Sequence, residues 1–451
     1  MDTRTLMKVV SAVETHEQIT VETTGARYVF HKIGPQGRIE CRQLINKDRS
    51  VGEAIISIPF DRLCLEAVDD EKCILHTIPY NLSCQFLRIE IHRDSMMEFT
   101  STGGYRLTYK TEFDPAYHVV KSGNVLSVDD IGGFGMYPYK GFEDVEIISD
   151  NRHQISYEYK MGQWNRFMLS VFPPRPYQLE QSFTERLYLS FSVTYGNNMA
   201  ANPYPSNDEI EKASKYTNIL WLFETMWKGK YAKTGKVLEN EADVYADASY
   251  ANYNYIPANE AELERVVKKA HSLNMRVLPY VSPFFSLAKG SDYINKIKGL
   301  LDKYQFDGVY LDGVSIDMWD GYELIRNLRQ TVQDGIIFWH CTVDPLGKNI
   351  FCPFIDTYVD YTLRAEHIHD FDNRYMRYVI SGINTGNAIG YTFYRGSPVD
   401  QFNTFIDRTL QNGARLYLDG LDKASSPYAE GILQRYFPRL DEQMKRGCKL
   451  E

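Results

Sequence analysis

The strongest constraint on the fold is a regular alternation of helix and strand patterns in the second half of the chain. From about residue 207 onward, amphipathic helical stretches such as residues 259–274 are followed by short apolar runs such as residues 275–283. This alternation indicates βα units and a parallel sheet. The pattern gives seven strands and a possible eighth in residues 242–250. Residues 207–451 therefore predict a (β/α)₈ TIM barrel, and a doubly wound open sheet is the alternative.

Residues 1–200 follow a different pattern. Short alternating or β-rich runs, such as residues 85–92 and residues 186–196, are separated by turn clusters such as residues 128–135. Regularly spaced strands of this kind predict an antiparallel β-sandwich. The polar, proline-bearing residues 197–208 then form a linker to the barrel.

Charge and cysteine usage exclude several classes of function. The net charge of −9 argues against a nucleic-acid partner, which usually meets a basic face. No apolar run approaches the ~20 residues that span a bilayer, so we expect no membrane contact. The N-terminus has no signal-peptide pattern, which favours the cytoplasm. The 7 cysteines are scattered and form no CxxC pair, so we expect reduced thiols rather than a disulfide framework or a zinc site.

One acidic residue stands where barrel enzymes place their chemistry. In residues 306–314, strand alternation directs Val309 and Leu311 toward the surrounding helices and Gly308, Tyr310 and Asp312 toward the barrel axis. Asp312 then lies at the carboxyl end of the strand, the catalytic face of such barrels. A carboxylate there suits catalysis, and the alternative is a cap for the next helix.

The run TYVDYTLRAE, residues 357–366, shows the same alternation of apolar and polar residues. We expect its apolar side chains to face the helices and its polar side chains to face the axis, where an ion pair could also fill the barrel. Glu366 comes last, at the catalytic rim. The expected apolar face is Val359, Tyr361, Leu363 and Ala365, and the expected polar row is Asp360, Thr362, Arg364 and Glu366.

Other polar or aromatic side chains follow the predicted strands at the same rim. Together they would make a polar pocket with aromatic walls that contacts a substrate. His367 and His369 form an HxH pair, but the first predicted strand carries no such pair, so we expect no metal. No dinucleotide or phosphate-loop glycine motif follows a strand, so we expect no cofactor. The predicted substrate contacts are Glu224, Trp227, Tyr280, Tyr310, His340, Asp344, Arg364, Tyr394 and Arg395.

A pair of carboxylates across a barrel mouth suits cleavage of a glycosidic bond. One acid protonates the leaving oxygen, and the other attacks the anomeric carbon or activates water. With YLDG on a central strand, the architecture resembles the clan of retaining α-glycosidases that includes melibiase-type α-galactosidases. The resemblance implies that Asp312 is the nucleophile and that Glu366, two strands later, is the acid/base. Glu366 stands where the clan has Asp, and Tyr310 stands where its KxD signature has Lys.

The sequence therefore predicts a retaining glycosidase for a small glycoside or oligosaccharide, with a homo-oligomer allowed. The glycine-rich, aromatic loop at residues 132–142 could contribute to the pocket. Two alternatives stay open. One is a carbohydrate-binding or scaffold protein on a decayed barrel, in which the acids do not converge. The other is a barrel lyase or hydrolase that acts on a modified sugar.

Overall fold

The structure is a computed structural model, and the chain forms two compact units. The first unit comprises residues 1–178, 348–357 and 371–388, and the second comprises residues 179–347, 358–370 and 389–451. The described residues are 9–23, 26–31, 37–43, 49–56, 62–68, 72–78, 86–92, 98–101, 105–108, 125–128, 133–138, 145–151, 154–160, 165–172, 183–190, 203–227, 254–312, 318–340, 358–364, 373, 376–377, 381, 389–392, 401–421 and 427–446.

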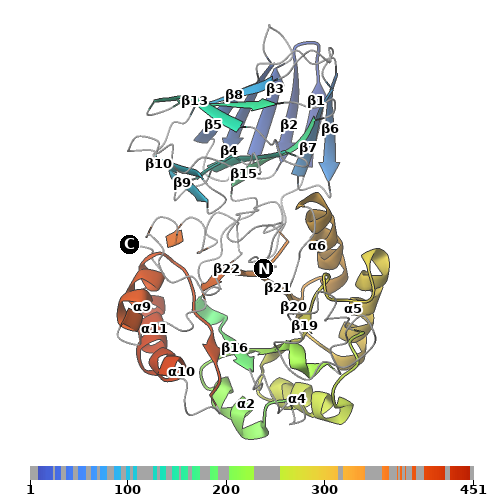
Figure 1. Ribbon diagram of the computed structural model, residues 1–451, viewed down its shortest axis with the longest axis vertical. Helices are drawn as coiled ribbons and strands as arrows, with labels where there is room; N and C mark the ends of the chain where they lie inside the picture. The colour runs from blue at the N-terminus through green and yellow to red at the C-terminus, as the bar shows by residue number, and fades with distance from the viewer. Residues whose placement is uncertain are drawn as a thin grey trace. The chain divides into compact units, whose positions relative to one another are not determined.

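The first unit contains two antiparallel sheets, as its alternating sequence pattern predicts (Figure 1). One is an eight-stranded sheet in the order β1 (Val9–Glu14), β2 (Gln18–Thr23), β3 (Ala26–His31), β4 (Gly37–Gln43), β5 (Arg49–Ile56), β8 (Phe86–His92), β14 (Gln154–Lys160) and β13 (Val145–Asn151). The other is a seven-stranded sheet in the order β10 (Tyr105–Thr108), β9 (Glu98–Ser101), β11 (Val125–Val128), β12 (Gly133–Pro138), β15 (Asn165–Phe172), β7 (Lys72–Ile78) and β6 (Arg62–Val68). Strands β4 and β5 of the first sheet approach β15 and β12 of the second.

The second unit contains parallel strands in two hydrogen-bonded groups. One group has the order β18 (Arg276–Leu278), β17 (Ile219–Leu222), β16 (Leu187–Ser190) and β24 (Leu418–Asp419). The other has the order β19 (Tyr280–Val281), β20 (Gly308–Leu311), β21 (Ile336–His340), β22 (Tyr361–Arg364) and β23 (Ile389–Thr392).

Short connections relate the two groups of parallel strands. Only Pro279, which has no N–H to donate, separates β18 from β19, so the two make one strand position. On the other side, the Thr392 amide donates to the Arg415 carbonyl at 2.8 Å, and the Arg415 amide donates to the Gly390 carbonyl at 3.0 Å. This bridge joins β23 to the segment that enters β24, and β24 pairs with β16. The bridge and the Pro279 connection therefore link the 5-stranded group to the 4-stranded group at both of its ends.

Helices lie between most consecutive parallel strands of the described residues, as the sequence pattern predicts. The helix of residues 402–411 is an exception, because the sequence analysis assigned no helix there. None of the helices in the described ranges has the length and apolar character that a membrane crossing requires. The helical segments are α2 (Asn207–Ser214), η2 (Glu224–Met226), α4 (Glu260–Ser272), α5 (Gly290–Tyr304), α6 (Met318–Val332), α9 (Phe402–Gln411), α10 (Pro427–Gly431), the π-helical η6 (Ile432–Tyr436) and α11 (Phe437–Lys445).

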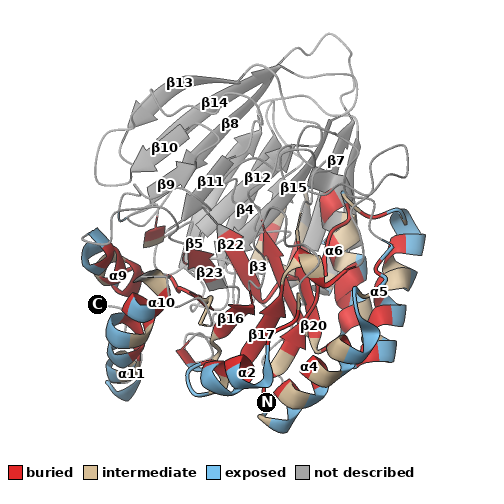
Figure 2. Ribbon diagram, turned by 60° about the horizontal axis from the view of Figure 1, so that its bottom comes forward, coloured by how far each residue is buried: buried red, intermediate tan, exposed pale blue. Residues whose placement is uncertain are grey.

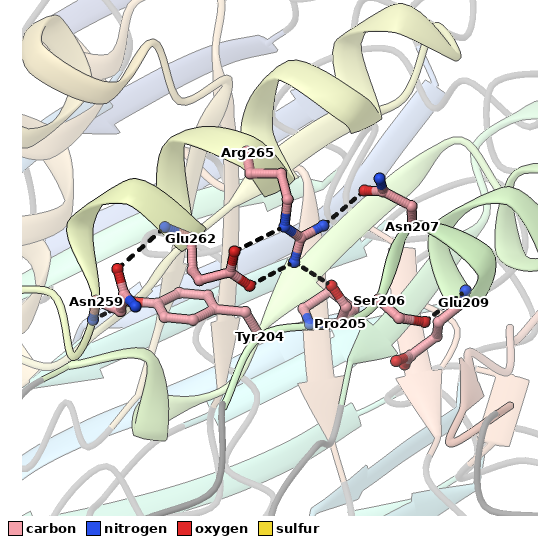
Figure 3. A network of polar contacts seen from close by, with 8 residues as sticks. All are labelled: Tyr204, Pro205, Ser206, Asn207, Glu209, Asn259, Glu262 and Arg265. Atoms are coloured by element: carbon pink, nitrogen blue, oxygen red, sulfur yellow. Dashed lines mark hydrogen bonds and ion pairs between the residues drawn. The ribbon is translucent and has the colours of Figure 1, made fainter.

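Side-chain caps fix where two of these helices begin, as Figure 3 shows. Asn259 caps α4 by accepting a hydrogen bond from the Glu262 amide at 3.2 Å, and Ser206 caps α2 by accepting one from the Glu209 amide at 3.1 Å. Arg265 of α4 then donates to the Asn207 side chain at 2.6 Å. It also donates to the Pro205 carbonyl at 2.7 Å. The capped start of α2 is therefore attached to α4.

The strand of residues 187–190 corrects the predicted domain boundary. The sequence analysis placed it in the domain of residues 1–200, with the barrel starting at 207. In the structure, Leu187–Ser190 is β16 and pairs in parallel with β17. A short β-rich run carries no signal for the direction of its partner, which explains the error. Counted from β16, β20 is the fourth strand position and β22 the sixth. Residues 242–250, the predicted second strand, lie outside the described residues.

Aromatic side chains from several of the parallel strands pack against one another. The Trp221 ring lies 3.9 Å from the Tyr310 ring and 4.9 Å from the Phe338 ring, centroid to centroid. All three side chains are buried, and Figure 2 shows the strands of this unit in the colour of buried residues. Further rings in contact with this cluster are Tyr361, Tyr391 and Tyr417.

This aromatic cluster shows that the face predicted for β22 is wrong. Tyr361 was expected to face the helices, but its ring meets Phe338 at 6.3 Å. Because alternate residues point to opposite faces, Asp360 and Thr362 face the helical side. Thr362 accepts a hydrogen bond from the Trp339 indole at 3.1 Å, and Asp360 pairs with Arg329 of α6. Periodicity separated the two faces of the strand correctly but could not say which one is inward.

The Arg329–Asp360 pair fixes α6 against β21 and β22. The Arg329 guanidinium donates to Asp360 Oδ2 at 2.6 Å and to the carbonyls of Tyr358, Gln333 and Gly335 at 2.7–2.8 Å. Asp360 Oδ2 also accepts from the Ile337 amide at 2.9 Å. The side chains are only 8% and 2% exposed, so removal of either partner leaves a buried, poorly compensated charge.

We predict that Asp360→Asn destabilises the second unit by about 3 kcal/mol or more, because Arg329 keeps its buried charge without a counter-ion. Urea unfolding followed by tryptophan fluorescence measures the loss. Glu442→Gln is the matched control, since it removes an ion pair whose side chains are 76% and 66% exposed. Equal urea midpoints for the Asp360→Asn protein and the unmodified protein would contradict the prediction.

Candidate active site

The Asp312 carboxylate lies at the carboxyl ends of three neighbouring strands. Asp312 directly follows β20, and its amide donates to the Val281 carbonyl at 2.8 Å. The Tyr280 hydroxyl of β19 donates to Asp312 Oδ2 at 2.7 Å. His340, the last residue of β21, places its Nδ1 atom 2.9 Å from Asp312 Oδ1. Parallel pairing of β20 with β19 and β21 brings these three side chains to one edge.

The hydrogen bonds to Asp312 fix the roles of the atoms involved. A carboxylate can only accept hydrogen bonds, so an ionised Asp312 requires the proton of the neutral His340 ring on Nδ1. Tyr280 supplies the second donor from a side chain that is only 1% exposed. The two donors hold both carboxylate oxygens in one orientation.

The side chains of Asp312 and His340 differ in how far they are exposed. The Asp312 side chain is 22% exposed and the His340 side chain is 7% exposed. Asp312 is therefore the member of the pair that a substrate can reach more easily. His340 is the residue that orients the Asp312 carboxylate. A carboxylate in this position can act as a nucleophile or as a general base.

The core beneath the cluster limits its movement. Tyr310, two residues before Asp312, places its ring 5.7 Å from the Tyr280 ring and 6.3 Å from the His340 ring. Gly308 begins the strand at a φ of 149°, and a Cβ atom there would lie 2.0 Å from the Ile336 carbonyl oxygen. Strand β20 can therefore approach β21 closely only with glycine at that position.

The structure brings together four of the residues predicted for the site: Asp312, Tyr280, Tyr310 and His340. Trp227 is buried, and its indole donates to the Tyr280 carbonyl at 2.6 Å. It therefore supports the backbone of β19. Glu224 is buried in η2, directly after β17.

Several predicted site residues lie outside the described residues. Arg364 ends β22, but its side chain belongs to this set. Of the loop predicted at residues 132–142, the structure describes residues 133–138, which form β12 in the first unit. The remaining residues of this kind are Glu366, Asp344, Tyr394, Arg395, His367 and His369. No group of three or more His, Cys, Asp or Glu side chains that could hold a metal ion occurs within the described ranges.

Sequence reasoning missed Tyr255, whose hydroxyl contacts the backbone next to Tyr280. The hydroxyl donates to the Ser282 carbonyl and accepts from the Ser282 amide, both at 2.9 Å. Tyr255 lies in the segment between η2 and α4, five residues beyond the possible strand of residues 242–250 and not at its end, so reasoning from strand ends did not select it. The only sequence signal nearby is the aromatic run of residues 250–255.

Comparisons with known proteins give distant matches to solved structures. No family model matches the chain, and no curated protein matches it. The cycloalternan-forming enzyme from Listeria monocytogenes, in complex with a pentasaccharide substrate, is 8% identical with a TM-score of 0.46; the match covers 97% of this chain and 54% of that one. A glycoside hydrolase family 97 enzyme from Pseudoalteromonas sp. strain K8, in complex with acarbose, is 8% identical with a TM-score of 0.45, covering 97% of this chain and 74% of that one.

An α-amylase from Geobacillus thermoleovorans, complexed with acarbose, is 11% identical with a TM-score of 0.39; the match covers 58% of this chain and 79% of that one. The chain spans about half the length of the cycloalternan-forming enzyme. At these scores the likeness decides neither activity nor substrate, and the resemblance to melibiase-type α-galactosidases stays a prediction.

Proposed function

We propose that the second unit is a (β/α)₈ barrel and that the chain is a glycoside hydrolase whose nucleophile is Asp312. The observation that carries this proposal is the Asp312 carboxylate at the end of the fourth strand position. It is partly exposed and is held by two more deeply buried side chains. Barrel enzymes place their catalytic groups at this end of their strands.

A fixed, accessible carboxylate suits attack on a sugar. One Asp312 oxygen forms a bond to the anomeric carbon while the glycosidic C–O bond breaks and the leaving oxygen takes a proton from an acid. Water then attacks the anomeric carbon of the glycosyl ester and gives its proton to the residue that acted as the acid in the first step. This releases Asp312. Tyr280 and His340 keep the carboxylate oriented through both steps, which reduces the entropy lost on reaching the transition state.

The second carboxylate of the proposed mechanism is Glu366. The sequence-based reason, inward alternation along β22, is wrong, but Glu366 follows the last residue of β22 by only two positions in the sequence. We propose Glu366 as the general acid/base and a small glycoside or oligosaccharide as the substrate. The proposed sugar contacts beyond the described residues are Asp344, Arg364, Tyr394 and Arg395.

The His340–Asp312 contact favours a second candidate function. A histidine whose Nδ1 meets a carboxylate can act as a general base through its other nitrogen, as a barrel lyase or another hydrolase would require. In that mechanism His340 reacts and Asp312 orients it. The lower exposure of His340 favours the glycosidase mechanism, and mutation of each residue distinguishes the two.

We predict that Asp312→Asn lowers turnover of the best substrate in a panel of aryl α- and β-glycosides by about 10³-fold or more, because an amide is a poor nucleophile. His340→Asn retains a donor toward Asp312, so we expect a loss of about tenfold, the scale of one weakened hydrogen bond. Circular dichroism checks that both variants fold. A larger loss in His340→Asn than in Asp312→Asn would favour the histidine-base mechanism, and full activity in Asp312→Asn would exclude both roles for that carboxylate.

We predict that Glu366→Ala slows hydrolysis of a glycoside with a poor leaving group by about 10²–10⁴-fold, the usual contribution of a general acid. A glycoside with a good leaving group, such as dinitrophenolate, needs no proton and should lose far less in the first step. Glu430→Ala, which removes an exposed carboxylate on α10, is the control. Equal losses on both substrates would contradict the acid role.

A further inference from the structure

We propose that Tyr255 and Trp227 are positioning residues that hold β19 so that the Tyr280 hydroxyl meets Asp312. They act on the strand backbone on both sides of Val281. The inference rests on the proposed function for its kinetic test, whereas the contact it describes can be tested without any substrate.

The hydrogen bonds of the two side chains lie on either side of Val281. The Trp227 indole donates to the Tyr280 carbonyl at 2.6 Å. The Tyr255 hydroxyl donates to the Ser282 carbonyl and accepts from the Ser282 amide, each at 2.9 Å. Three backbone groups around one residue are thus bound by two side chains from another part of the chain.

The backbone segment held in this way contacts Asp312 twice. The Val281 carbonyl accepts from the Asp312 amide at 2.8 Å, and the Tyr280 hydroxyl donates to the carboxylate at 2.7 Å. A displacement of this segment therefore moves both the Asp312 main chain and a donor to its side chain. Displacements of about 1 Å in a catalytic geometry can cost about 10²-fold in rate.

The segments that carry Trp227 and Tyr255 are themselves fixed. The Ala258 amide donates to the Met226 carbonyl at 2.8 Å, and the Tyr204 hydroxyl donates to the same carbonyl at 2.7 Å. The Trp227 and Tyr255 rings meet edge to face at 5.3 Å. Both side chains are buried, so packing as well as hydrogen bonding holds them in place.

The backbone of Tyr255 also points to a structural requirement. Its φ of 54° lies in the left-handed region, which a bulky residue rarely adopts. Such a conformation costs of the order of 1–3 kcal/mol and persists where the surroundings impose it. Tyr255 adopts this conformation while its hydroxyl binds both the amide and the carbonyl of Ser282.

Burial makes this hydroxyl a dependable donor. Desolvation raises the pKa of Tyr255 to about 12, so the hydroxyl stays protonated throughout the pH range of an ordinary assay. Any pH dependence that appears when Tyr255 is changed must therefore come from the site that it positions and not from its own titration.

The test compares Tyr255→Phe and Trp227→Phe with a matched control, Tyr304→Phe. The first two keep an aromatic ring and remove the Tyr255 hydroxyl or the Trp227 indole N–H. Tyr304 lies on α5 and is buried, and its hydroxyl donates to the Glu260 carboxylate at 3.0 Å, so it takes no part in the bonds at Tyr280 and Ser282. We expect kcat to fall about tenfold or more in Tyr255→Phe and Trp227→Phe with KM within about twofold, and Tyr304→Phe to keep the parent kcat.

The pH profile distinguishes positioning from a general loss of stability. If the Tyr280 donor is displaced, the carboxylate loses a hydrogen bond to its charged form, and the acidic limb of the kcat/KM profile moves to higher pH. A general loss of stability would lower the amount of active enzyme without moving this limb. Unchanged kcat and an unchanged acidic limb in both variants would overturn the proposal.

Crystal structures of Tyr255→Phe and Trp227→Phe decide the matter if no glycoside in the panel is hydrolysed. In that event the proposed function fails, but the positioning proposal still expects the Tyr280 hydroxyl to lie beyond hydrogen-bond distance of Asp312 in at least one variant. A Tyr280–Asp312 bond of 2.7 Å in both variants, as in the parent, would overturn it. Two variants are used so that one that fails to fold does not prevent the test.

Discussion

The buried ion pair between Arg329 and Asp360 joins α6 to β22 and fixes the orientation of that strand. Because Asp360 finds its counter-ion on α6, β22 turns its polar face toward the helices and its Tyr361 ring toward Phe338. The side of β22 that faces away from α6 can then pack against aromatic rings, and these rings also contact side chains of β20 and β21. A β22 rotated to the opposite face would place Asp360 against this aromatic interior without a partner, at a large desolvation cost.

The candidate site is built on this interior in successive layers. Tyr310 packs on Trp221 and Phe338. Tyr280, which is level with Tyr310 in the strand pairing, and His340, two residues after Phe338, bind the Asp312 carboxylate. Burial therefore increases from the partly exposed carboxylate toward the core, an arrangement that suits a positioned catalytic group. Tyr255 and Trp227 extend the same support to the backbone of β19.

Sequence alone gave the βα alternation and the inward direction of Asp312, because strong helical periodicity and short apolar runs report local structure. It could not place β16, since strand propensity does not specify the partner of a strand. It also reversed the faces of β22: the partner of Asp360 is 31 residues away, on a helix whose orientation no local pattern reveals. The sequence analysis missed Tyr255 for a similar reason, because its contact with Ser282 joins segments that are 27 residues apart.

The most direct measurement is covalent trapping. A glycosyl fluoride of the accepted sugar that also carries a fluorine on the ring should form a long-lived ester. The ring fluorine destabilises the oxocarbenium-like transition states of both steps, whereas the good fluoride leaving group keeps the first step fast. Mass spectrometry of the digested protein identifies the labelled residue. The account predicts one added glycosyl group, attached at Asp312. A label on another carboxylate, or a product released with inverted anomeric configuration and no label, would contradict it.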